Sequence, residues 1–583
     1  MIKKIVYSIF LVLIVVCACA YFYMTNEGPS VDDVGKKVVA NPEKYDVWDG
    51  TVATEFASGS GTVKDPYLIS TGAELALFSQ IMNEDSTAEY IGACYCLVNS
   101  IDLNGMEWEP IGYSTYKTAQ KYKDGMYVIE GFYTTGRAFE GVFEGKGCVI
   151  KNYKITTAER EMVGFFGDLN GAIVRNVGFC DYSINITHKN DTKLFVGGVA
   201  GMSRNNARIL GCYTTGSNVV ASTTKMAAVG GIVGSNEGNS AVERCFTIGE
   251  VYAVIRGGER SAPAYAGGIA AFNEGKIADC YTKGNIYAYG STQSVYAGGI
   301  AAVHGAQISS ATVDETMVNC YAWGDIYANG ACHVYVGGLA ALNYGKMVNG
   351  LAAGNLTAIA ESGYDAYIGG VVGYASSADA WNCYKFFSQT LNSSGKTVRT
   401  CDIGTEINSD EARSSVFQET TLRFGDSWDF TTASYPGLLG LPETVTIEYG
   451  NSKAAFLRGA DFALGTASRT GYNFLGWKAN GSLITDASGK RLDDYTLRSD
   501  VLALAEYEVV FYTITYHNTT GATHDNPLVY SIEGVGITLK DASGSQGEFA
   551  GWYTDPDFEH PISEIAMGTH GNLDLYAKWE IEE

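Results

Sequence analysis

Histidines, cysteines and carboxylates are the side chains on which most catalytic and metal sites depend, and this chain lacks their usual spacings. Its seven histidines never come closer than seven residues, so the pair one helical turn apart that a zinc protease needs is absent. The sequence also contains no Gly-x-Ser-x-Gly nucleophile elbow and no complete phosphate-binding loop. We therefore predict no catalytic, cofactor-binding or metal-binding residues and expect a protein that is not an enzyme.

One set of polar residues keeps an enzymatic alternative open. Glu250, Asn285, Asp325 and Asn355 each follow a glycine at the same point of a sequence repeat. If the repeats stack about 4.8 Å apart, the two carboxylates lie roughly 10 Å apart, near the upper limit for an inverting glycosidase. The alternative hypothesis is a polysaccharide-degrading β-helix enzyme, a lyase or a glycoside hydrolase. Recurrence at one repeat position, however, favours a role in turns.

A repeated double glycine indicates which elements position these residues. Two glycines followed by small apolar residues occur six times, with successive copies 33, 37, 31, 39 and 32 residues apart. A period of this size is typical of a solenoid, in which one unit stacks on the next. The copies begin at Gly197, Gly230, Gly267, Gly298, Gly337 and Gly369.

The interior of one repeat divides into three short segments separated by glycines. Residues 265–273, 276–281 and 285–288 have the length of strands. Three strands per turn predict an all-β fold, a right-handed parallel β-helix with hydrogen bonds between its turns. Asparagines that precede glycines predict corners with a positive backbone φ. These are Asn170, Asn236, Asn273 and Asn343.

Cysteines and tyrosines also recur at fixed points of the repeat. Equivalent residues of stacked turns sit about 4.8 Å apart, so we predict an interior column of thiols, either packed as small apolar side chains or joined by disulfides between turns. The tyrosines could pack together or stack against sugars. The predicted column contains Cys212, Cys245, Cys280, Cys320 and Cys383, with Cys180 as its extension. The recurring tyrosines are Tyr252, Tyr287 and Tyr327.

Charge and the first residues predict an exported protein. The net charge of −24 and the pI of about 4.7 disfavour nucleic acid, which needs a basic surface. Lys3 and Lys4 precede an uncharged run from residue 5 to 24, so residues 1–25 are predicted to be a signal or membrane anchor. Lipidation at Cys19 and plain secretion are the alternatives. Each of them places the rest of the chain at the cell surface or outside the cell.

The segments on either side of the repeats have their own character. Residues 26–47 are polar and predict a stalk, and residues 48–395 predict the β-solenoid. Within the solenoid, leucines at helical spacing in 72–82 predict a helix that closes its open end, and 113–137 predicts a surface excursion. Residues 396–440 predict a cap or linker.

The C-terminal part of the chain has a different composition. Two aromatic-rich units, residues 443–509 and 511–581, align on Phe474-Leu475-Gly476-Trp477 and Phe549-Ala550-Gly551-Trp552. Each unit contains several short strand-like segments. We therefore predict two small β-grasp-like modules.

These motifs resemble two bacterial families. The unit of double glycine, Asn-x-Gly and Cys-Tyr resembles the GLUG repeat over about residues 160–390, and the two C-terminal units resemble the Listeria–Bacteroides repeat found in internalins. The resemblance implies a non-enzymatic bacterial cell-surface protein whose solenoid wall and C-terminal repeats serve in adhesion. The implied partner is a surface glycan or an extracellular protein, with the bacterial membrane contacted through the N-terminal segment. Cofactors are not expected.

Overall fold

The computed structural model describes most of the chain from residue 31 onward, and this part divides into two compact units. The first contains residues 31–444 with 455–457, and the second contains 445–454 with 458–581. The predicted anchor (1–25), including Cys19, lies outside the described residues. The described ranges are 31–84, 88–123, 126–157, 160–187, 193–216, 218–256, 262–305, 316–375, 379–430, 435–544 and 547–581.

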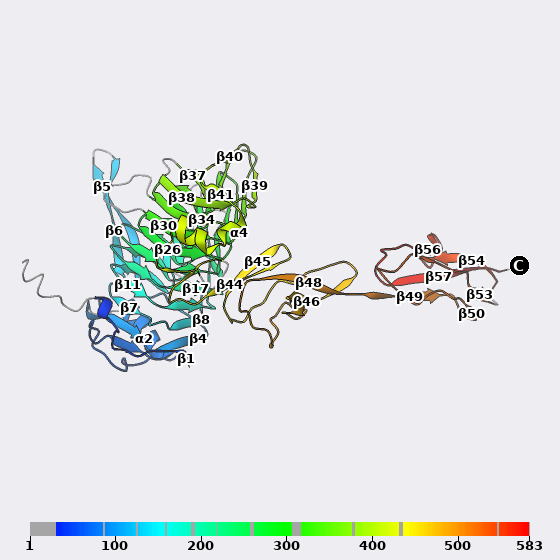
Figure 1. Cartoon of the computed structure of the whole chain (residues 1–583), viewed down its shortest axis with the longest axis horizontal. Coiled ribbons are helices and arrows are strands. Elements are labelled where there is room, and N and C mark those ends of the chain that lie inside the picture. The colour runs from blue at the N-terminus through cyan, green and yellow to red at the C-terminus, as the bar shows by residue number, and fades with distance from the viewer. Residues whose placement is uncertain are drawn as a thin grey trace, which may run out of the picture. The chain divides into compact units, whose positions relative to one another are not determined.

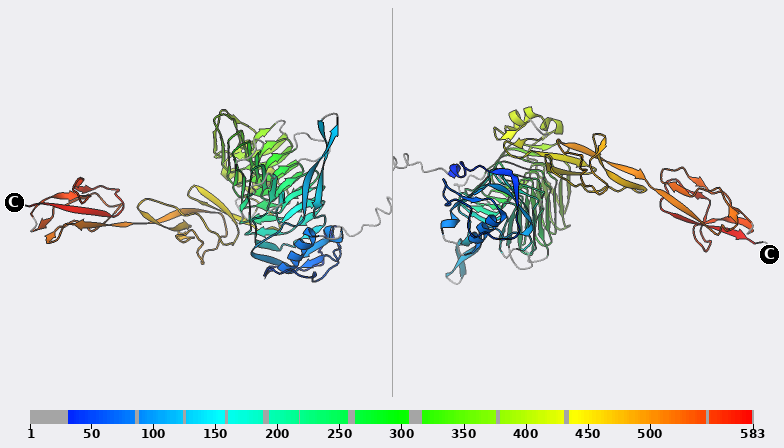
Figure 2. Two further views of the ribbon diagram at one scale, coloured as in Figure 1. Left: turned by 180° about the vertical axis from the view of Figure 1, so that it is seen from behind. Right: turned by 90° about the horizontal axis from the view of Figure 1, so that it is seen from below.

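The first unit has an all-β fold of the parallel β-helix type, in which each strand pairs with the equivalent strand of the next turn (Figures 1 and 2). We call its eight-stranded sheet sheet 1 and its seven-stranded sheet sheet 2. Sheet 1 contains β9 (Met162–Val163), β14 (Lys193–Gly197), β19 (Met226–Gly230), β24 (Ala264–Gly267), β28 (Val295–Gly298), β32 (Val334–Gly337), β36 (Ala366–Gly369) and β40 (Val398–Thr400). Sheet 2 contains β10 (Phe166–Asn170), β15 (Ala200–Arg204), β20 (Val233–Asn236), β25 (Ala270–Asn273), β29 (Ala301–His304), β33 (Ala340–Asn343) and β37 (Val372–Ala375).

Sheet 3 has 24 strands because several segments of each turn pair within it. Its early strands are β1 (Asn41–Val47), β2 (Tyr67–Ile69), β3 (Cys94–Leu97), β4 (Asn99–Glu107), β7 (Val142–Glu144), β8 (Val149–Ile155), β11 (Ile173–Arg175), β12 (Gly178–Cys180) and β13 (Ser183–Thr187). The next are β16 (Arg208–Leu210), β17 (Tyr213–Thr215), β18 (Asn218–Thr223), β21 (Ala241–Glu243), β22 (Phe246–Thr247), β23 (Glu250–Ile255), β26 (Lys276–Thr282) and β27 (Ile286–Gly290). The last are β30 (Thr316–Ala322), β31 (Ile326–Gly330), β34 (Lys346–Ala352), β35 (Leu356–Ala360), β38 (Asp379–Phe386), β39 (Leu391–Ser394) and β41 (Thr405–Ile407).

An inner turn contains four strands rather than the three predicted. The predicted strand 265–273 is interrupted at its double glycine, so its halves are β24 in sheet 1 and β25 in sheet 2. The backbone is crowded there: a Cβ on Gly267 would lie 1.8 Å from the carbonyl oxygen of Ala270, and one on Gly268 would lie 2.1 Å from that of Gly299. The double glycine therefore forms a corner where two chain segments approach closely, and not the middle of a strand.

The predicted asparagine corners are confirmed only in part. Gly171 and Gly238 have positive φ, 68° and 61°, but Asn236 and Asn273 end strands of sheet 2 and bury their side chains. The asparagine ladder with positive φ lies elsewhere, directly before the cysteine positions. It includes Asn176, Asn319, Asn349 and Asn382, with φ of 54° or 55°. The Asn349 and Asn382 amides donate to the preceding asparagine of the ladder at 2.8 and 2.9 Å.

The buried asparagines form a polar ladder inside the β-helix. Asn236 Nδ2 donates to Asn273 Oδ1 at 2.7 Å, and Asn273 Nδ2 lies 3.0 Å from His304 Nδ1. His304 Nε2 donates to the carbonyl oxygen of Lys346 at 3.0 Å. Because Nε2 faces a carbonyl, it must carry the proton, and Nδ1 accepts the amide. Burial lowers the pKa of His304, which agrees with a neutral ring.

The predicted cysteine column is present. Cys280 and Cys320 are register partners in adjacent turns, and the backbone N–H of Cys212 lies 3.4 Å from Cys245 Sγ. Cys383 follows beyond Gly350, which occupies the intervening position. These cysteines are buried and free in the structure. The column therefore packs as small apolar side chains within the core.

Cys180 does not extend the column, which corrects the prediction. Its register partner in the next turn is Thr215, and it belongs to an outer hydrophobic cluster. In the two turns before Cys212, the position of the column is occupied by Val177 and Cys148. The carbonyl oxygen of each accepts a hydrogen bond from a backbone N–H of the next turn, as the carbonyl oxygens of the column cysteines do in later turns. Sequence alignment of the Cys-Tyr pairs missed Cys148 because Val149 follows it.

Residues 31–47 do not form a free stalk. They contain the short helix η1 (Val31–Asp33) and β1, which pairs in parallel with β4.

The predicted helix 72–82 is confirmed as α2 (Gly72–Asn83), which begins with a capping box between Thr71 and Glu74. Phe78 on α2 packs within 5.8 Å of the rings of Tyr95, Phe139 and Phe143. The short helix α3 (Ala88–Ile91) follows, and α2 lies near β1 and β4 (Figure 1). The predicted surface excursion at 113–137 is an antiparallel hairpin of β5 (Tyr113–Lys123) and β6 (Met126–Arg137).

The segment after the last turn returns along the side of the β-helix. We call residues 407–430 and 435–441 the strap. It covers a stacked row on sheet 3, the covered row, formed by Tyr213, Phe246, Tyr281 and Tyr321, whose successive rings lie 4.8–5.0 Å apart. Trp428 of the strap lies 6.0 and 5.7 Å from the rings of Tyr281 and Tyr321. The elements of the strap are α4 (Ser409–Ala412), η2 (Phe417–Leu422), β42 (Trp428–Asp429) and β43 (Gly437–Leu438).

The two C-terminal modules have five-stranded sheets with the same strand order. In each, a glycine of the Phe-x-Gly-Trp motif lies in a β-bulge with positive φ, 144° at Gly476 and 132° at Gly551. The following Trp477 and Trp552 are buried. The sheets are β45 (Ser452–Leu457), β44 (Thr444–Tyr449), β48 (Val501–Val509), β46 (Tyr472–Ala479) and β47 (Ser482–Leu483), and β51 (Val529–Ser531), β49 (Phe511–His517), β57 (Leu573–Glu580), β54 (Glu548–Tyr553) and β55 (Pro561–Ile562). The second module also contains β50 (Ala522–Thr523), β52 (Ile537–Thr538), β53 (Ser543–Gly544) and β56 (Glu564–Ile565).

Candidate functional site

A row of partly exposed tyrosines runs along the outer face of sheet 1. Tyr265, Tyr296, Tyr335 and Tyr367 are register partners in four successive turns, and we call them the open row. Their ring centroids are 4.7, 4.8 and 4.4 Å apart, with interplanar angles of 9–11°. Each tyrosine alternates with buried residues of its strand, such as Ala264, so the sheet directs the row outward.

A second open row lies on sheet 3 and contains the tyrosines that the sequence singled out. Tyr252, Tyr287 and Tyr327 are register partners, as predicted. The rings of Tyr252 and Tyr287 stack at 4.5 Å. The open row of sheet 1 was missed in the sequence, although each of its tyrosines stands two residues before a double glycine.

Stacking decides which part of each ring a ligand can contact. Because neighbouring rings are nearly parallel and close, they cover one another's faces, so a ligand can reach ring edges but not ring faces. Burial raises the pKa of Tyr265, Tyr296 and Tyr335. Burial and the nearby Glu250 charge raise the pKa of Tyr287 to about 12. The rows therefore present uncharged phenols at regular intervals along the β-helix.

The last turn adds aromatic surface to the open row. Tyr374 on sheet 2 is 41% exposed and packs edge-on against Tyr367 at 5.7 Å. The guanidinium of Arg399 lies 5.7 Å from the Tyr367 ring and donates to Asp365 Oδ2 at 3.1 Å. The ion pair between Arg399 and Asp365 thus lies at the end of the open row.

The carboxylates of the enzymatic alternative have separate partners. Tyr252 donates its hydroxyl to Glu250 Oε2 at 2.7 Å. The backbone N–H of Asn355 donates to Asp325 Oδ1 at 2.8 Å, and that of Asp325 donates to Asn285 Oδ1 at 2.9 Å. Side-chain oxygens at this repeat position thus hold the backbone of the next turn, as turn residues do.

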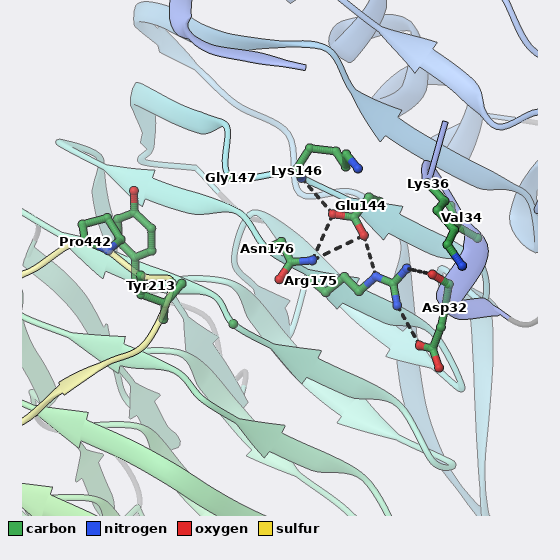
Figure 3. Close-up of a pocket in the computed structure, with 13 residues that line it drawn as sticks. Asp32, Val34, Lys36, Glu144, Lys146, Gly147, Arg175, Asn176, Tyr213 and Pro442 are labelled. Carbon is green, nitrogen blue, oxygen red and sulfur yellow. Dashed lines mark hydrogen bonds and ion pairs between the residues drawn. The ribbon is translucent and has the colours of Figure 1, made fainter. Parts of the chain in front are cut away.

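A charged hollow of 730 Å³ lies in the first unit beside the covered row (Figure 3). Arg175 Nε donates to Glu144 Oε2 at 2.6 Å, and its NH1 donates to Asp32 Oδ1 at 2.9 Å. The Arg175 and Glu144 side chains are 8% and 4% exposed. Asn176 Nδ2 and the backbone N–H of Lys146 also donate to Glu144. No local motif signals this site, because Asp32 and Arg175 are 143 residues apart.

The described ranges contain neither a membrane-spanning helix nor a cluster of metal-binding side chains. Among these residues no helix is long and apolar enough to cross a membrane. Within the same ranges, no three His, Cys, Asp or Glu side chains gather in a way that could hold a metal ion. The predicted N-terminal anchor, residues 1–25, lies outside these ranges.

Comparison with known proteins identifies one part of the chain by family. Residues 512–578 match the Listeria–Bacteroides repeat domain. The second C-terminal module is such a repeat. The predicted GLUG resemblance of the solenoid stays a prediction.

Two known proteins are similar to parts of this chain. A protein of Evansella cellulosilytica named as a Gly-rich membrane protein is 27% identical over an alignment of 273 residues, which covers 42% of this chain and 30% of that protein. Halomucin of Haloquadratum walsbyi is 30% identical over 158 residues, 27% of this chain and 2% of its own length. The chain therefore spans less than a third of either relative. A membrane protein and a mucin-named protein are consistent with a surface or extracellular location.

Two solved structures also match parts of this chain at low similarity. A protein of Bacteroides ovatus assigned as an immunoglobulin A1 protease covers 67% of this chain and 98% of its own, with 21% identity and a TM-score of 0.40. A second structure, titled IgA1 Protease, covers 54% of this chain and 21% of its own, with 18% identity and a TM-score of 0.32.

Proposed function

We propose that this is a non-enzymatic bacterial cell-surface protein that binds a neutral polysaccharide along the open tyrosine rows. The observation that carries the proposal is the in-register stacking of Tyr265, Tyr296, Tyr335 and Tyr367 on a partly exposed face. A periodic row suits a periodic ligand, and an extended polysaccharide repeats its hydroxyl groups along its length. Ring edges and phenol hydroxyls offer it apolar contact and hydrogen bonds.

The charge of the chain favours an uncharged ligand. With a net charge of −24, the protein repels polyanions at long range. The phenols of the open rows are neutral, so their hydrogen bonds do not depend on salt. A neutral glycan is thus a better match than an acidic polymer for this surface.

The test removes hydroxyl groups and keeps the rings. In the variant with Tyr296→Phe and Tyr335→Phe, stacking is retained and two hydrogen-bonding groups are lost, about 1 kcal/mol each. We expect 10- to 30-fold weaker binding to the best ligand of a neutral polysaccharide panel, measured by affinity electrophoresis and calorimetry. The matched control is Tyr45→Phe, because Tyr45 is 42% exposed in β1 and outside both rows. Equal binding by the double variant would contradict the proposal.

The N-terminal run and the C-terminal repeats are assigned the roles of anchor and of spacer or adhesion module. The uncharged N-terminal run anchors the chain as a membrane segment, or through a lipid at Cys19, and mass spectrometry of the mature N-terminus distinguishes these from release. The C-terminal repeats act as spacer or adhesion modules. We also infer that the β-helix is right-handed, as parallel crossovers nearly always are, and that α2 caps its N-terminal end.

The alternative, cleavage of the polysaccharide, has less support. Glu250 and Asp325 are used in separate hydrogen bonds, and Asn285 lies between them. An assay for new reducing ends or unsaturated products on each bound polysaccharide tests it directly. We expect no products above the background rate.

A further inference from the structure

We propose that the charged hollow beside the covered row is a second ligand site, which takes a hydroxylated carboxylate of monosaccharide size, such as a uronic acid. The proposal does not depend on the tyrosine rows. The hollow of 730 Å³ lies within the range of small-ligand sites. Its walls come from three distant parts of the first unit: the N-terminal segment, the first full turns and the end of the strap (Figure 3).

The floor of the hollow is a hydrogen-bonded cluster in which one guanidinium, that of Arg175, serves two carboxylates, Glu144 and Asp32. Glu144 accepts from Arg175, from Asn176 and from the backbone of Lys146. The remaining Arg175 nitrogens donate to the side chain and the carbonyl of Asp32. A buried pair with its hydrogen bonds filled holds its geometry rigidly. Arg175 and Glu144 are therefore positioning residues for the groups around them.

Lys146 provides the positive charge that a ligand can use. It lines the hollow, and its ammonium group makes no ion pair within the described part of the chain. Its backbone has a φ of 55° and is followed by Gly147 with a φ of 81°, and its N–H is fixed by Glu144 at 2.8 Å. The turn is thus constrained, although the ammonium group remains available. In a chain with a net charge of −24, such a lysine marks a local site for an anion.

Neutral groups that line the hollow indicate which other groups the ligand carries. The Asn176 Nδ2 atom is occupied by Glu144, which leaves Oδ1 to accept a hydroxyl group. Asn176 Oδ1 faces Gly211, and a Cβ on that residue would lie only 3.0 Å from the oxygen. The absence of a side chain at Gly211 therefore leaves room for a ligand hydroxyl to reach Oδ1. Leu441 and Pro442 of the first unit supply an apolar wall. A carboxylate, hydroxyls and an apolar face together describe an acidic sugar.

Calorimetry on the full chain tests the site with defined probes. Free glucuronate represents a free sugar acid, and a glucuronate-terminated oligosaccharide represents the acidic end of a glycan. Glucose is the uncharged comparison. We expect at least one acidic probe to bind at least tenfold more tightly than glucose. Binding of neither acidic probe above the level of glucose would overturn the proposal.

Variants of one lysine locate the binding. Lys146→Asn removes the charge and tolerates the positive φ, so we expect at least tenfold weaker binding, with Lys146→Arg restoring most of it. Lys154→Asn, an exposed lysine on β8, is the matched control and should bind as the parent does. Unchanged binding by Lys146→Asn would contradict the assignment. The Tyr296→Phe, Tyr335→Phe double variant should bind glucuronate normally, so the two proposals fail separately.

Discussion

The covered row and the open row have the same ring geometry but differ in exposure. Both stack aromatic rings of successive turns at about the same spacing: Tyr281 and Tyr321 are 4.8 Å apart at 3°, and Tyr296 and Tyr335 are 4.8 Å apart at 11°. The strap buries the first pair completely, whereas the second pair keeps contact with solvent. Stacking by itself is therefore a structural device of this β-helix.

The difference lies in what the rest of the chain places over each row. Trp428 and Phe424 of the strap occupy the outer surface of the covered row, so its tyrosines contribute to the hydrophobic core. The four tyrosines of the open row, in contrast, remain partly exposed. Exposure, and not the ring ladder, is thus the observation that favours binding.

Truncation of one ring in each row gives the largest expected contrast. Tyr281→Ala leaves a cavity between two stacked rings and the strap, so we expect a loss of about 4 kcal/mol in the free energy of unfolding. Tyr296→Ala removes a half-buried ring, and we expect about 1 kcal/mol. Urea denaturation followed by circular dichroism measures both. Equal losses would mean that the strap does not stabilise the row beneath it.

The glycine corners connect the two rows across a narrow interior. A Cβ on Gly299 would lie 2.1 Å from the carbonyl oxygen of Gly338 and 2.5 Å from the Cβ of Ala322, which follows Tyr321 of the covered row. We therefore expect Gly299→Ala to cost about 3 kcal/mol. Gly363→Ala is the control, because a Cβ there meets nothing within 4 Å. A cost below 1 kcal/mol for Gly299→Ala would show that the corner can widen.

How much the sequence predicts depends on whether a feature repeats. The cysteine column, the row at Tyr287 and the repeating turns follow from periodicity, because stacked turns bring equivalent residues together. The open row was equally visible in the sequence, because its tyrosines stand two residues before four of the six double glycines. The split at Gly267 was missed because short apolar runs do not reveal a corner.

Features that occur once were beyond sequence reasoning. The strap has no period, and its position depends on contacts such as that of Trp428 with Tyr321, far apart in the chain. The charged hollow depends on Asp32 meeting Arg175, which no local motif signals. Non-local docking of this kind comes from packing, and only the structure shows it.

The buried polar ladder gives a contrast in pH dependence with the outer rows. Because the pKa of His304 is lowered in the folded protein, the unfolded chain binds the extra proton first as the pH falls. Stability is therefore fully present above about pH 6.5 and falls below it, by at most about 1.4 kcal/mol per pH unit. His304→Asn, which copies Asn273 and Asn236, should remove this part of the slope. An unchanged acid limb in denaturation at pH 4–7 would contradict the assignment of the neutral ring.

The smallest effect concerns the phenols of the open rows at high pH. The pKa of Tyr287 is raised to about 12, above the ordinary value of about 10, so the unfolded chain loses this proton first as the pH rises. The stability that Tyr287 contributes is complete below pH 10 and is lost between about pH 10 and 12. Tyr287→Phe should flatten the alkaline limb of the denaturation curve slightly, and phenolate absorbance should show one fewer late-titrating tyrosine. Tyr327→Phe, for a ring on the same row, is the comparison. If Tyr287 instead titrates near pH 10, its ring edge is more hydrated than the stacked geometry implies. The open and covered rows would then differ even more in their exposure to solvent.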